Sequence, residues 1–439
     1  MMLAVSAGTA WAQVRPTVAP TPVVPLPRVD PLAPQAPAMA PTPAVAPGVV
    51  APAEPVIPVV LPPAVWQPGQ GQELLTYIQA IGNEGLDPRD YDPVLLEAAL
   101  RAADPAALSA AATGSWDKLA RDLALGHVRG SARVQWFVRD PDFPEGRSRQ
   151  LLDAALAGGG AGAVAGGGIA TTLDGLLPTH PQYNALKASL AKAAAAKSPN
   201  VGKIRLNLDR WRWLPRDLGS RYIIVNVPGE HATLVENSVT RWKHRAIAGA
   251  VKTPTPQLAV QATGVMLNPW WEVPPSLSAE VAGKAGYVAV KRKDGTVQRW
   301  RQPPGPGNAL GKIKFTMYNP QNIYLHDTNN RGLFDARSRF LSHGCIRTEH
   351  VLDLAAELLS DDGGEWSKAR IDEVLASKKT VAATFVKPVP VYIVYFSVAA
   401  LVDGNIHQYS DLYKRDAPVL AALNDRDGGD KVKVRAAAR

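Results

Sequence analysis

The stretch Ser342-His343-Gly344-Cys345-Ile346-Arg347 contains the only cysteine of this 439-residue chain, and His326 lies nineteen residues before Cys345 in Tyr324-Leu325-His326-Asp327-Thr328. A single thiol cannot form a disulfide within the chain, so it is a buried inert side chain, a metal ligand or an activated nucleophile. A cysteine attacks as its thiolate, and a neighbouring imidazole or main-chain N–H groups must lower its pKa from about 8.5. The pattern predicts a cysteine nucleophile with a histidine base.

The residues on either side predict two chain segments that meet at the thiol. The apolar run 322–325 is typical of a short strand that ends at His326, and residues 340–346 form a second approach to the same place. Gly344 permits a tight turn directly before Cys345. Main-chain N–H groups in this turn are available for an oxyanion hole.

Two other uses of Cys345 fit its surroundings less well. A buried structural cysteine would also bury the polar side chains of Ser342, His343 and Arg347. A zinc site would have to use His326, His343, Cys345 and His350. His343 and Cys345 are too close in sequence for a usual ligand pair, and a second cysteine is missing. We therefore expect no metal ligand set and no cofactor.

Several blocks of sequence resemble those of a known family. They are Asn207 to Pro215, Asn268 to Ser276, Pro303 to Gly311, Lys387 to Tyr392 and Asp411 to Asp416. With the histidine, the Ser-His-Gly-Cys motif and the following arginine, the region from 207 to about 423 resembles the catalytic region of the large Gram-negative L,D-transpeptidases, which carry a YkuD-type domain.

The resemblance implies catalytic roles for four residues. Cys345 is the nucleophile, and His326 is the general base, held by a nearby carbonyl group. His343 lines the site beside an oxyanion hole at Gly344.

The resemblance also implies contacts with the substrate. Tyr324 flanks the base, and Ser342 and Arg347 position the substrate or the turn. From the residues alone, Arg347 is equally well a partner in a structural ion pair. Asn308 lies in a Gly- and Pro-rich loop and is a further substrate-binding candidate, although asparagine is common in turns.

The implied reaction is peptidoglycan L,D-transpeptidation, in which a thioester forms on Cys345 and passes to a second stem peptide. We expect 3→3 cross-links, and carbapenems would acylate the same thiol. The residues leave three alternatives open: 1→3 cross-links, a cysteine L,D-carboxypeptidase that releases the thioester to water, and an inactive wall-binding protein. The partners are donor and acceptor stem peptides, with no nucleic acid and no stable membrane span.

The expected fold class is α+β, with an N-terminal helical scaffold domain followed by a β-rich L,D-transpeptidase catalytic domain and flanking helices. In the scaffold domain, expected at 66–200, residues Leu74, Leu75, Ile78 and Ile81 fall on one helical face, and Leu95, Leu96, Ala99 and Leu100 on another. The catalytic domain is expected at 201–425, with strand-like sequence beyond Val201. A short capping segment at 277–301 contains a hairpin turn at Lys291 to Gly295, and a basic tail follows at 426–439.

The remaining sequence is typical of an exported protein. Residues 1–12 resemble a truncated signal peptide that ends in Ala10-Trp11-Ala12, and the Pro- and Ala-rich residues 13–65 are typical of an extended linker. The net charge of +9 suits an anionic cell envelope, or is simply a solvated basic surface. We expect a periplasmic, wall-associated protein without the peptidoglycan-binding module that many relatives carry.

Overall fold

The computed structural model describes residues 62–139, 143–144, 146–158, 168–360, 365–401 and 403–429. The expected signal peptide, nearly all of the expected linker and most of the expected basic tail lie outside these residues. Within them, no helix combines the length and the apolar character needed to cross a membrane.

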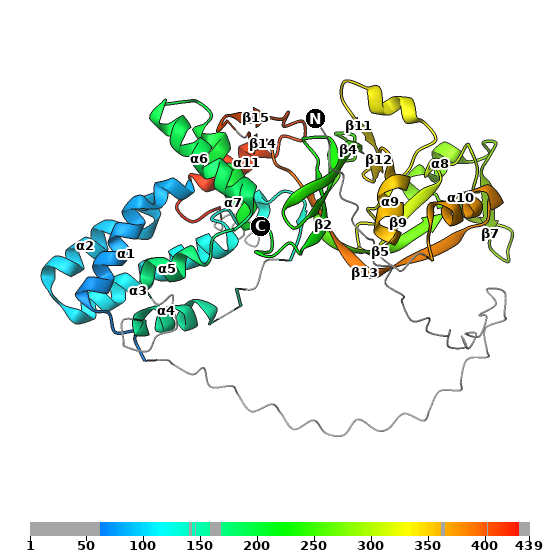
Figure 1. The fold of residues 1–439 in the computed structure, drawn as a ribbon. Coiled ribbons are helices and arrows are strands. Elements are labelled where there is room, and N and C mark those ends of the chain that lie inside the picture. The colour runs from blue at the N-terminus through cyan, green and yellow to red at the C-terminus, as the bar shows by residue number, and fades with distance from the viewer. Residues whose placement is uncertain are drawn as a thin grey trace, which may run out of the picture. The chain divides into compact units, whose positions relative to one another are not determined.

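The N-terminal part of the described chain is helical (Figure 1). Its helices are α1 (Pro68–Ala80), α2 (Pro93–Ala102), α3 (Pro105–Leu125), α4 (Arg147–Ala157), α5 (Ile169–Asp174), α6 (Pro181–Ala195) and α7 (Val201–Arg212). Proline begins α1, α2, α3 and α6, where its fixed φ suits a first turn and its missing N–H costs no hydrogen bond. Asp104 caps α3 by accepting from the N–H groups of Ala106 and Ala107.

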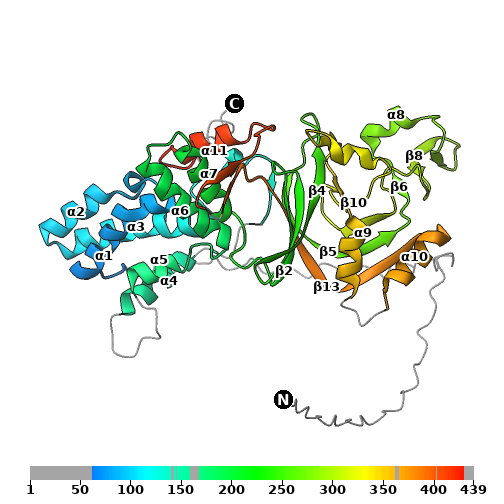
Figure 2. The same cartoon turned by 45° about the horizontal axis from the view of Figure 1, so that its top comes forward.

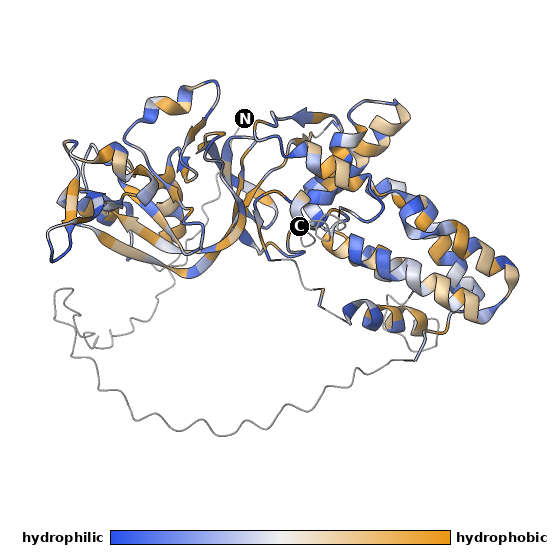
Figure 3. Cartoon of the chain, turned by 180° about the vertical axis from the view of Figure 1, so that it is seen from behind, coloured by the Kyte–Doolittle hydropathy of each residue, from blue (hydrophilic) through white to orange (hydrophobic). Residues whose placement is uncertain are grey.

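Apolar stripes on these helices form a separate helical core. The predicted inward face of α1 is confirmed, since Leu74, Leu75, Ile78 and Ile81 are all buried. On α2 the prediction was wrong for Leu95, which is 59% exposed, whereas Leu96 is fully buried. Consecutive helical residues point about 100° apart, so a helix with a narrow buried stripe cannot bury both. Hydrophilic and hydrophobic residues alternate around the helices in Figure 3.

Helix α7 connects the helical part to the sheet. Strand-like sequence was predicted beyond Val201, but residues Val201–Arg212 are helical and β2 begins only at Arg221. Helices α6, α7 and α11 (Asp416–Leu423) pack together (Figure 2). Asp209, fully buried, accepts hydrogen bonds from the main-chain N–H of His127 at 2.7 Å and from Trp213 Nε1 at 2.9 Å.

The main sheet has the strand order β1-β5-β13-β2-β3-β4-β12-β10-β9, and a further pairing of β5 with β9 closes this path on itself. The long strands are β4 (Val239–Gly249), β5 (Gln257–Leu267) and β13 (Val381–Val394), with β2 (Arg221–Asn226) and β3 (His231–Glu236) between β13 and β4. The remaining strands are β1 (Trp136–Phe137), β9 (Ile313–Met317), β10 (Leu325–His326) and β12 (Ile346–Thr348), with β11 (Phe340–Ser342) paired to β4. Helices α9 (Val351–Leu359) and α10 (Lys368–Ser377) contribute to the same core.

A small three-stranded sheet joins residues of the expected capping segment, 277–301, to a short strand that precedes it. It consists of β6 (Trp271–Glu272), β8 (Val297–Gln302) and β7 (Val288–Lys291), with the short helix α8 (Ser278–Val281) between β6 and β7. The predicted hairpin is confirmed, because β7 and β8 pair antiparallel and Gly295 has a φ of +85°. A separate two-stranded sheet joins β14 (Val398–Ala400) to β15 (Ile406–Gln408).

Candidate active site

Strand β10 brings His326 to the centre of the candidate site. It pairs parallel with β12, where His326 lies opposite Arg347, and antiparallel with β9, where His326 lies opposite Lys314. The predicted strand before His326 therefore exists, although it covers only Leu325 and His326. Since β12 follows Cys345 directly, the pairing of β10 with β12 sets the histidine beside the thiol turn.

The turn before Cys345 requires its glycine. Gly344 has a φ of +116°, which a residue with a side chain rarely adopts. Ser342 is buried, and its hydroxyl donates to the Cys345 carbonyl at 2.6 Å and accepts from the Gly344 N–H at 3.1 Å. Thr255 Oγ1 donates to the Gly344 carbonyl at 2.8 Å. These bonds fix the main chain from which the thiol projects, and they use the only hydrogen-bond donor of the Ser342 side chain within the turn.

The thiol of Cys345 is half-buried and hydrogen-bonded. Burial raises the pKa of the thiol, while main-chain and side-chain hydrogen bonds from Tyr324 and the charges of Lys314 and Arg347 lower it; burial is the larger effect. The thiol also lies 3.5 Å from the carbonyl oxygen of Asn322. In the resting site the group is therefore protonated at neutral pH.

His326 is neutral in this setting. Burial lowers its pKa to about 3, the charges of Arg347 and Lys314 act in the same direction, and a main-chain hydrogen bond with Asp327 opposes them. The site at rest therefore contains a thiol and a neutral imidazole. A neutral imidazole can accept a proton, which is what a general base requires.

Two cations lie near the thiol without a carboxylate partner of their own. Lys314 Nζ lies 4.8 Å from the centre of the Tyr324 ring. Burial lowers the pKa of Lys314 and of Arg347. The Cys345 thiol opposes that effect at both residues, and the Glu272 carboxylate also opposes it at Lys314. Among the described residues, neither side chain has a carboxylate within ion-pair distance. No structural ion pair of Arg347 is present among the described residues, and its contact with the substrate stays a prediction.

The Cys345 thiol lines a cavity, and residues of the expected capping segment and its flanks form much of the cavity wall. The residues of the wall that come from the capping segment and its flanks are Trp271, Pro274, Leu277, Glu280, Val281, Lys284 and Tyr287. The main sheet and its loops contribute Ala309, Leu310, Tyr324, His326, Ser342, His343, Cys345 and Arg347. His343 is exposed at this wall, whereas His326 is buried in it.

Comparison with known proteins agrees with this arrangement. Residues 220–392 match the family model described as the L,D-transpeptidase catalytic domain. They form an L,D-transpeptidase catalytic domain. Residues 63–190 match the model of the Scaffold domain. The chain is therefore an α+β protein in which a helical scaffold domain precedes an L,D-transpeptidase domain, as the sequence predicted.

A curated relative is a Haemophilus influenzae protein described as a candidate L,D-transpeptidase, 32% identical over 257 residues. The match covers 52% of this chain and 51% of the relative, so the chain spans about half the length of the curated protein it matches.

Similar solved structures include the E. faecium L,D-transpeptidase catalytic domain acylated by ertapenem, at 14% identity and a TM-score of 0.22, over 40% of this chain and 97% of that one. The Mycobacterium smegmatis L,D-transpeptidase aligns at 12% identity and a TM-score of 0.21, over 40% of this chain and 58% of that one.

Asn308 has a different environment from the other predicted site residues of the L,D-transpeptidase domain. Its side-chain amide is 1% exposed and donates to the carbonyl groups of Pro269 at 3.0 Å and Pro303 at 2.9 Å. Its Oδ1 accepts from the Leu310 N–H at 2.8 Å. Ala309 and Leu310 line the cavity, so Asn308 holds the loop that presents them.

Two residues beside the thiol, Trp271 and Lys314, were not predicted from the sequence. The Trp271 side chain donates a hydrogen bond to Tyr324, whose hydroxyl is hydrogen-bonded to Cys345, and Lys314 packs over the same tyrosine. Trp271 lies in the Asn268 to Ser276 block that carried the resemblance, which is a signal that could have marked it. Lys314 alternates with buried residues of β9, and nothing in that pattern distinguishes it from a solvent-facing lysine.

Proposed function

We propose that the protein is a peptidoglycan L,D-transpeptidase that joins stem peptides through a thioester on Cys345. One observation supports this best: the only thiol of the chain lines the cavity of the L,D-transpeptidase domain, hydrogen-bonded by Tyr324 and close to two cations and a neutral histidine. A buried structural cysteine would need none of these neighbours.

In the first half-reaction, Cys345 attacks the carbonyl carbon of an L-configured donor residue. The thiol proton passes to His326 as the C–S bond forms, because the imidazole is neutral and the thiol is protonated before attack. His326 then returns the proton to the departing D-amino acid when the peptide C–N bond breaks. The products are the thioester and a free D-amino acid.

The second half-reaction transfers the acyl group. The amine of an acceptor stem attacks the thioester carbonyl, loses a proton to His326, and expels the Cys345 sulfur, which regains a proton. A new peptide bond has then formed and the free thiol is restored. Water in place of the amine would give the carboxypeptidase reaction, so exclusion of water by the capping segment would favour transfer.

The negative charge that develops in these steps needs partners. The main-chain N–H of Cys345 is suited to an oxyanion, with exposed His343 beside it, whereas the Gly344 N–H already donates to Ser342 Oγ at 3.1 Å. Lys314 and Arg347 favour the thiolate over the thiol by charge. They also oppose protonation of His326, so they keep the imidazole neutral before attack and act against the imidazolium that forms when it takes the thiol proton.

Arg347 is the stronger candidate for contact with the substrate. It lines the cavity, and among the described residues no carboxylate pairs with it. Stem peptides carry carboxylates on D-Glu and on diaminopimelate, and a guanidinium binds a carboxylate through two parallel hydrogen bonds. We assign Ser342 and Asn308 to the support of the turn and the loop, because their polar atoms bond to the main chain.

We further propose a 3→3 linkage and a periplasmic location. The donor would be the diaminopimelate carbonyl, with release of D-Ala, and the basic chain would work on the anionic envelope. Both proposals rest on the L,D-transpeptidase domain and not on a cavity residue that selects one bond.

The test is incubation of the purified protein with sacculi, followed by muropeptide digestion and tandem mass spectrometry. Dimers whose donor stem ends at diaminopimelate are expected. Donor stems that retain only L-Ala would instead establish 1→3 linkage, and shortened monomers without dimers would establish the carboxypeptidase.

Cys345→Ala provides the matched control. It should abolish dimer formation and the single intact-mass adduct expected with a carbapenem, while its far-UV circular dichroism stays unchanged. Dimers formed by the folded Cys345→Ala protein would refute the proposed nucleophile.

A further inference from the structure

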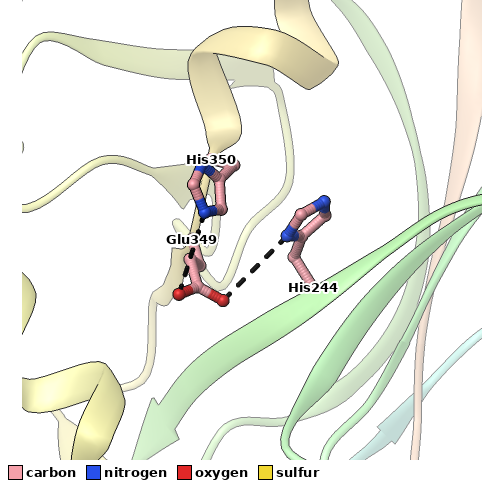
Figure 4. Close-up of side chains that lie close together, drawn as sticks. All are labelled: His244, Glu349 and His350. Carbon is pink, nitrogen blue, oxygen red and sulfur yellow. Dashed lines mark ion pairs between the residues drawn. The ribbon is translucent and has the colours of Figure 1, made fainter.

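A cluster of three side chains that could bind a metal ion lies at the C-terminal end of β12. Cys345 lies at the opposite, N-terminal end of that strand. It consists of His244, Glu349 and His350. One ligand atom of each residue lies within 4.8 Å of the ligand atoms of the other two. Among the described residues, these three form the group of His, Cys, Asp or Glu side chains that could hold a metal ion. In Figure 4 the two imidazole rings face the Glu349 carboxylate from either side.

Strand pairing explains why the two histidines meet. β4 and β12 are antiparallel with Ala246 opposite Thr348, and the Glu349 N–H continues the ladder by donating to the Arg245 carbonyl at 3.0 Å. Two residues after Thr348 and two residues before Ala246, the same antiparallel register sets His350 opposite His244, and the ring centres are 4.8 Å apart. The cluster is therefore built on sheet geometry and not on two independent loops.

The nitrogen atoms are directed as metal binding requires. His244 Nδ1 and His350 Nε2 each lie 4.0 Å from a Glu349 oxygen. On the other side of the His350 ring, Nδ1 lies 3.5 Å from Asp353 Oδ2. A carboxylate behind a histidine commonly fixes the tautomer that leaves the opposite nitrogen free to bind a metal.

We propose that His244, Glu349 and His350 bind one divalent transition-metal ion of the zinc type, with Asp353 as the residue that orients His350. Two imidazoles and a carboxylate are a ligand set that zinc accepts, with water in the fourth position. Bonds of about 2.0–2.1 Å in a tetrahedron place ligand atoms about 3.3 Å apart. The side chains must close by roughly 1.5 Å at most, and His350 is 53% exposed and free to rotate.

Arg245 is the group that opposes this binding. Its guanidinium bonds both Glu349 oxygens, at 3.0 Å through Nε and 2.5 Å through Nη2. A carboxylate oxygen has a second lone pair and can accept this bond while it binds a metal. Arg245 also contacts Asp335 at 2.7 Å, so the carboxylates of Glu349, Asp335 and Asp353 outnumber the one guanidinium. The local charge favours a cation, and Arg245 lowers its affinity without preventing it.

The sequence predicted no metal ligand set, and the proposed site at His244, Glu349 and His350 differs from that prediction. That expectation considered His350 together with His326, His343 and Cys345, because these residues are close in sequence. His244 comes from β4, far earlier in the chain, and only the pairing of β4 with β12 brings it near.

The test measures Zn²⁺ binding to the full chain, free of any affinity tag, by isothermal titration calorimetry. Cys345→Ser is the reference protein, since a thiolate would itself bind zinc. One Zn²⁺ per chain is expected. His350→Ala and His244→Ala in this background should each weaken binding at least tenfold, and Asp353→Asn should weaken it several-fold, as loss of an orienting partner does.

His407→Ala is the matched control, because His407 is an exposed strand histidine outside the cluster and should bind as the reference does. Saturating Zn²⁺ should also raise the melting temperature of the reference protein but not that of His350→Ala. Equal binding by the reference and by both histidine variants would overturn the site, as would the lack of saturable binding. Neither result would bear on the proposed transpeptidase reaction, which uses Cys345.

Discussion

At the scale of single residues, the charge states of the site follow from where two cations lie. Lys314 and Arg347 both lie in a partly buried region, and neither has a carboxylate at ion-pair distance among the described residues. Each interacts with Cys345, and the Glu272 charge also acts on Lys314. The same positive charge helps to hold His326 neutral. A resting ion pair between thiolate and imidazolium is therefore disfavoured. The thiolate is stabilised by fixed cations and by Tyr324 when it forms.

This arrangement predicts the effect of removing the lysine charge. Lys314→Gln should raise the thiol pKa further, so the rate of iodoacetamide alkylation at pH 8 should fall about tenfold for each pKa unit gained. Lys312→Gln is the matched control, because Lys312 is exposed just before β9 and should alkylate like the unmodified chain. Rate profiles from pH 6 to 11 measure both. Equal midpoints for the two variants would remove Lys314 from the activation of Cys345.

The base is tested by the same measurement. His326→Ala should suppress alkylation more at neutral pH than at high pH, where the thiolate forms without help. His343→Ala should do less, since the exposed His343 is assigned to the cavity wall. A reversed order of the two variants would exchange their roles.

At the scale of secondary-structure elements, the turn before β9 has a steric requirement. Gly311 has a φ of +63°, and a Cβ atom there would lie 2.4 Å from Asp327 Oδ2. Asp327 follows His326 directly and accepts from the Lys312 N–H at 2.9 Å. The Asp327 carboxylate therefore packs against Gly311 and bonds to Lys312, so it connects the end of β10 to the turn before β9.

Gly311→Ala should for this reason disturb the site as well as the fold. The left-handed backbone alone costs about 1–2 kcal/mol with a side chain, and the contact with Asp327 adds to it. Gly286→Ala isolates the first effect, since Gly286 has a φ of +85° and open space around its Cβ position. Thermal melts and alkylation rates should show a larger loss for Gly311→Ala. Identical losses would mean that Asp327 moves aside without cost.

The end of α3 contains an ion pair that should make stability depend on pH. Burial lowers the pKa of His127, but the Asp122 carboxylate at 2.6 Å outweighs it and raises the pKa to about 9. The folded pKa lies above the unfolded value of about 6.5, so the stabilisation is complete below pH 6.5 and is lost as the pH rises through 9. The stabilisation of the folded protein by this pair is on the order of 3 kcal/mol.

Urea unfolding at pH 6, 7.5 and 9 tests this ion pair. The unfolding free energy should fall across the series, and His127→Gln should flatten the fall. An unchanged slope in His127→Gln would assign the pH dependence to other groups.

Some of these elements could be predicted from the sequence and others could not, for physical reasons. The strand before His326 and the turn at Gly344 were predicted because each depends on a few consecutive residues. Helix α7 was missed because its buried face carries Asn207, Asp209 and Arg210, which an apolar periodicity does not register. Lys314 and His244 were missed because each gains its neighbours from strand pairing between distant segments.

At the scale of the whole molecule, α7 and the C-terminal segment attach the scaffold domain to the sheet. Asn207 Nδ2 donates to Ser397 Oγ at 3.0 Å, beyond the end of β13. Arg210 Nη1 donates to Asp416 at 2.7 Å, at the start of α11. Residues of the block Asn207 to Pro215 thus make buried hydrogen bonds between segments far apart in sequence. The scaffold and catalytic domains should consequently unfold together.

Arg210→Ala tests this coupling. Arg210 is 2% exposed, and its removal leaves Asp416 buried without its cation, a loss that typically costs about 3–5 kcal/mol. Differential scanning calorimetry of the unmodified chain should give one transition, and Arg210→Ala should lower its midpoint or divide it into two. Arg370→Ala, which breaks an exposed pair with Glu373 at 2.8 Å, should change the stability by less than about 1 kcal/mol. Two transitions in the unmodified chain would show instead that the scaffold domain folds independently of the sheet, and that α7 is a connection without energetic coupling.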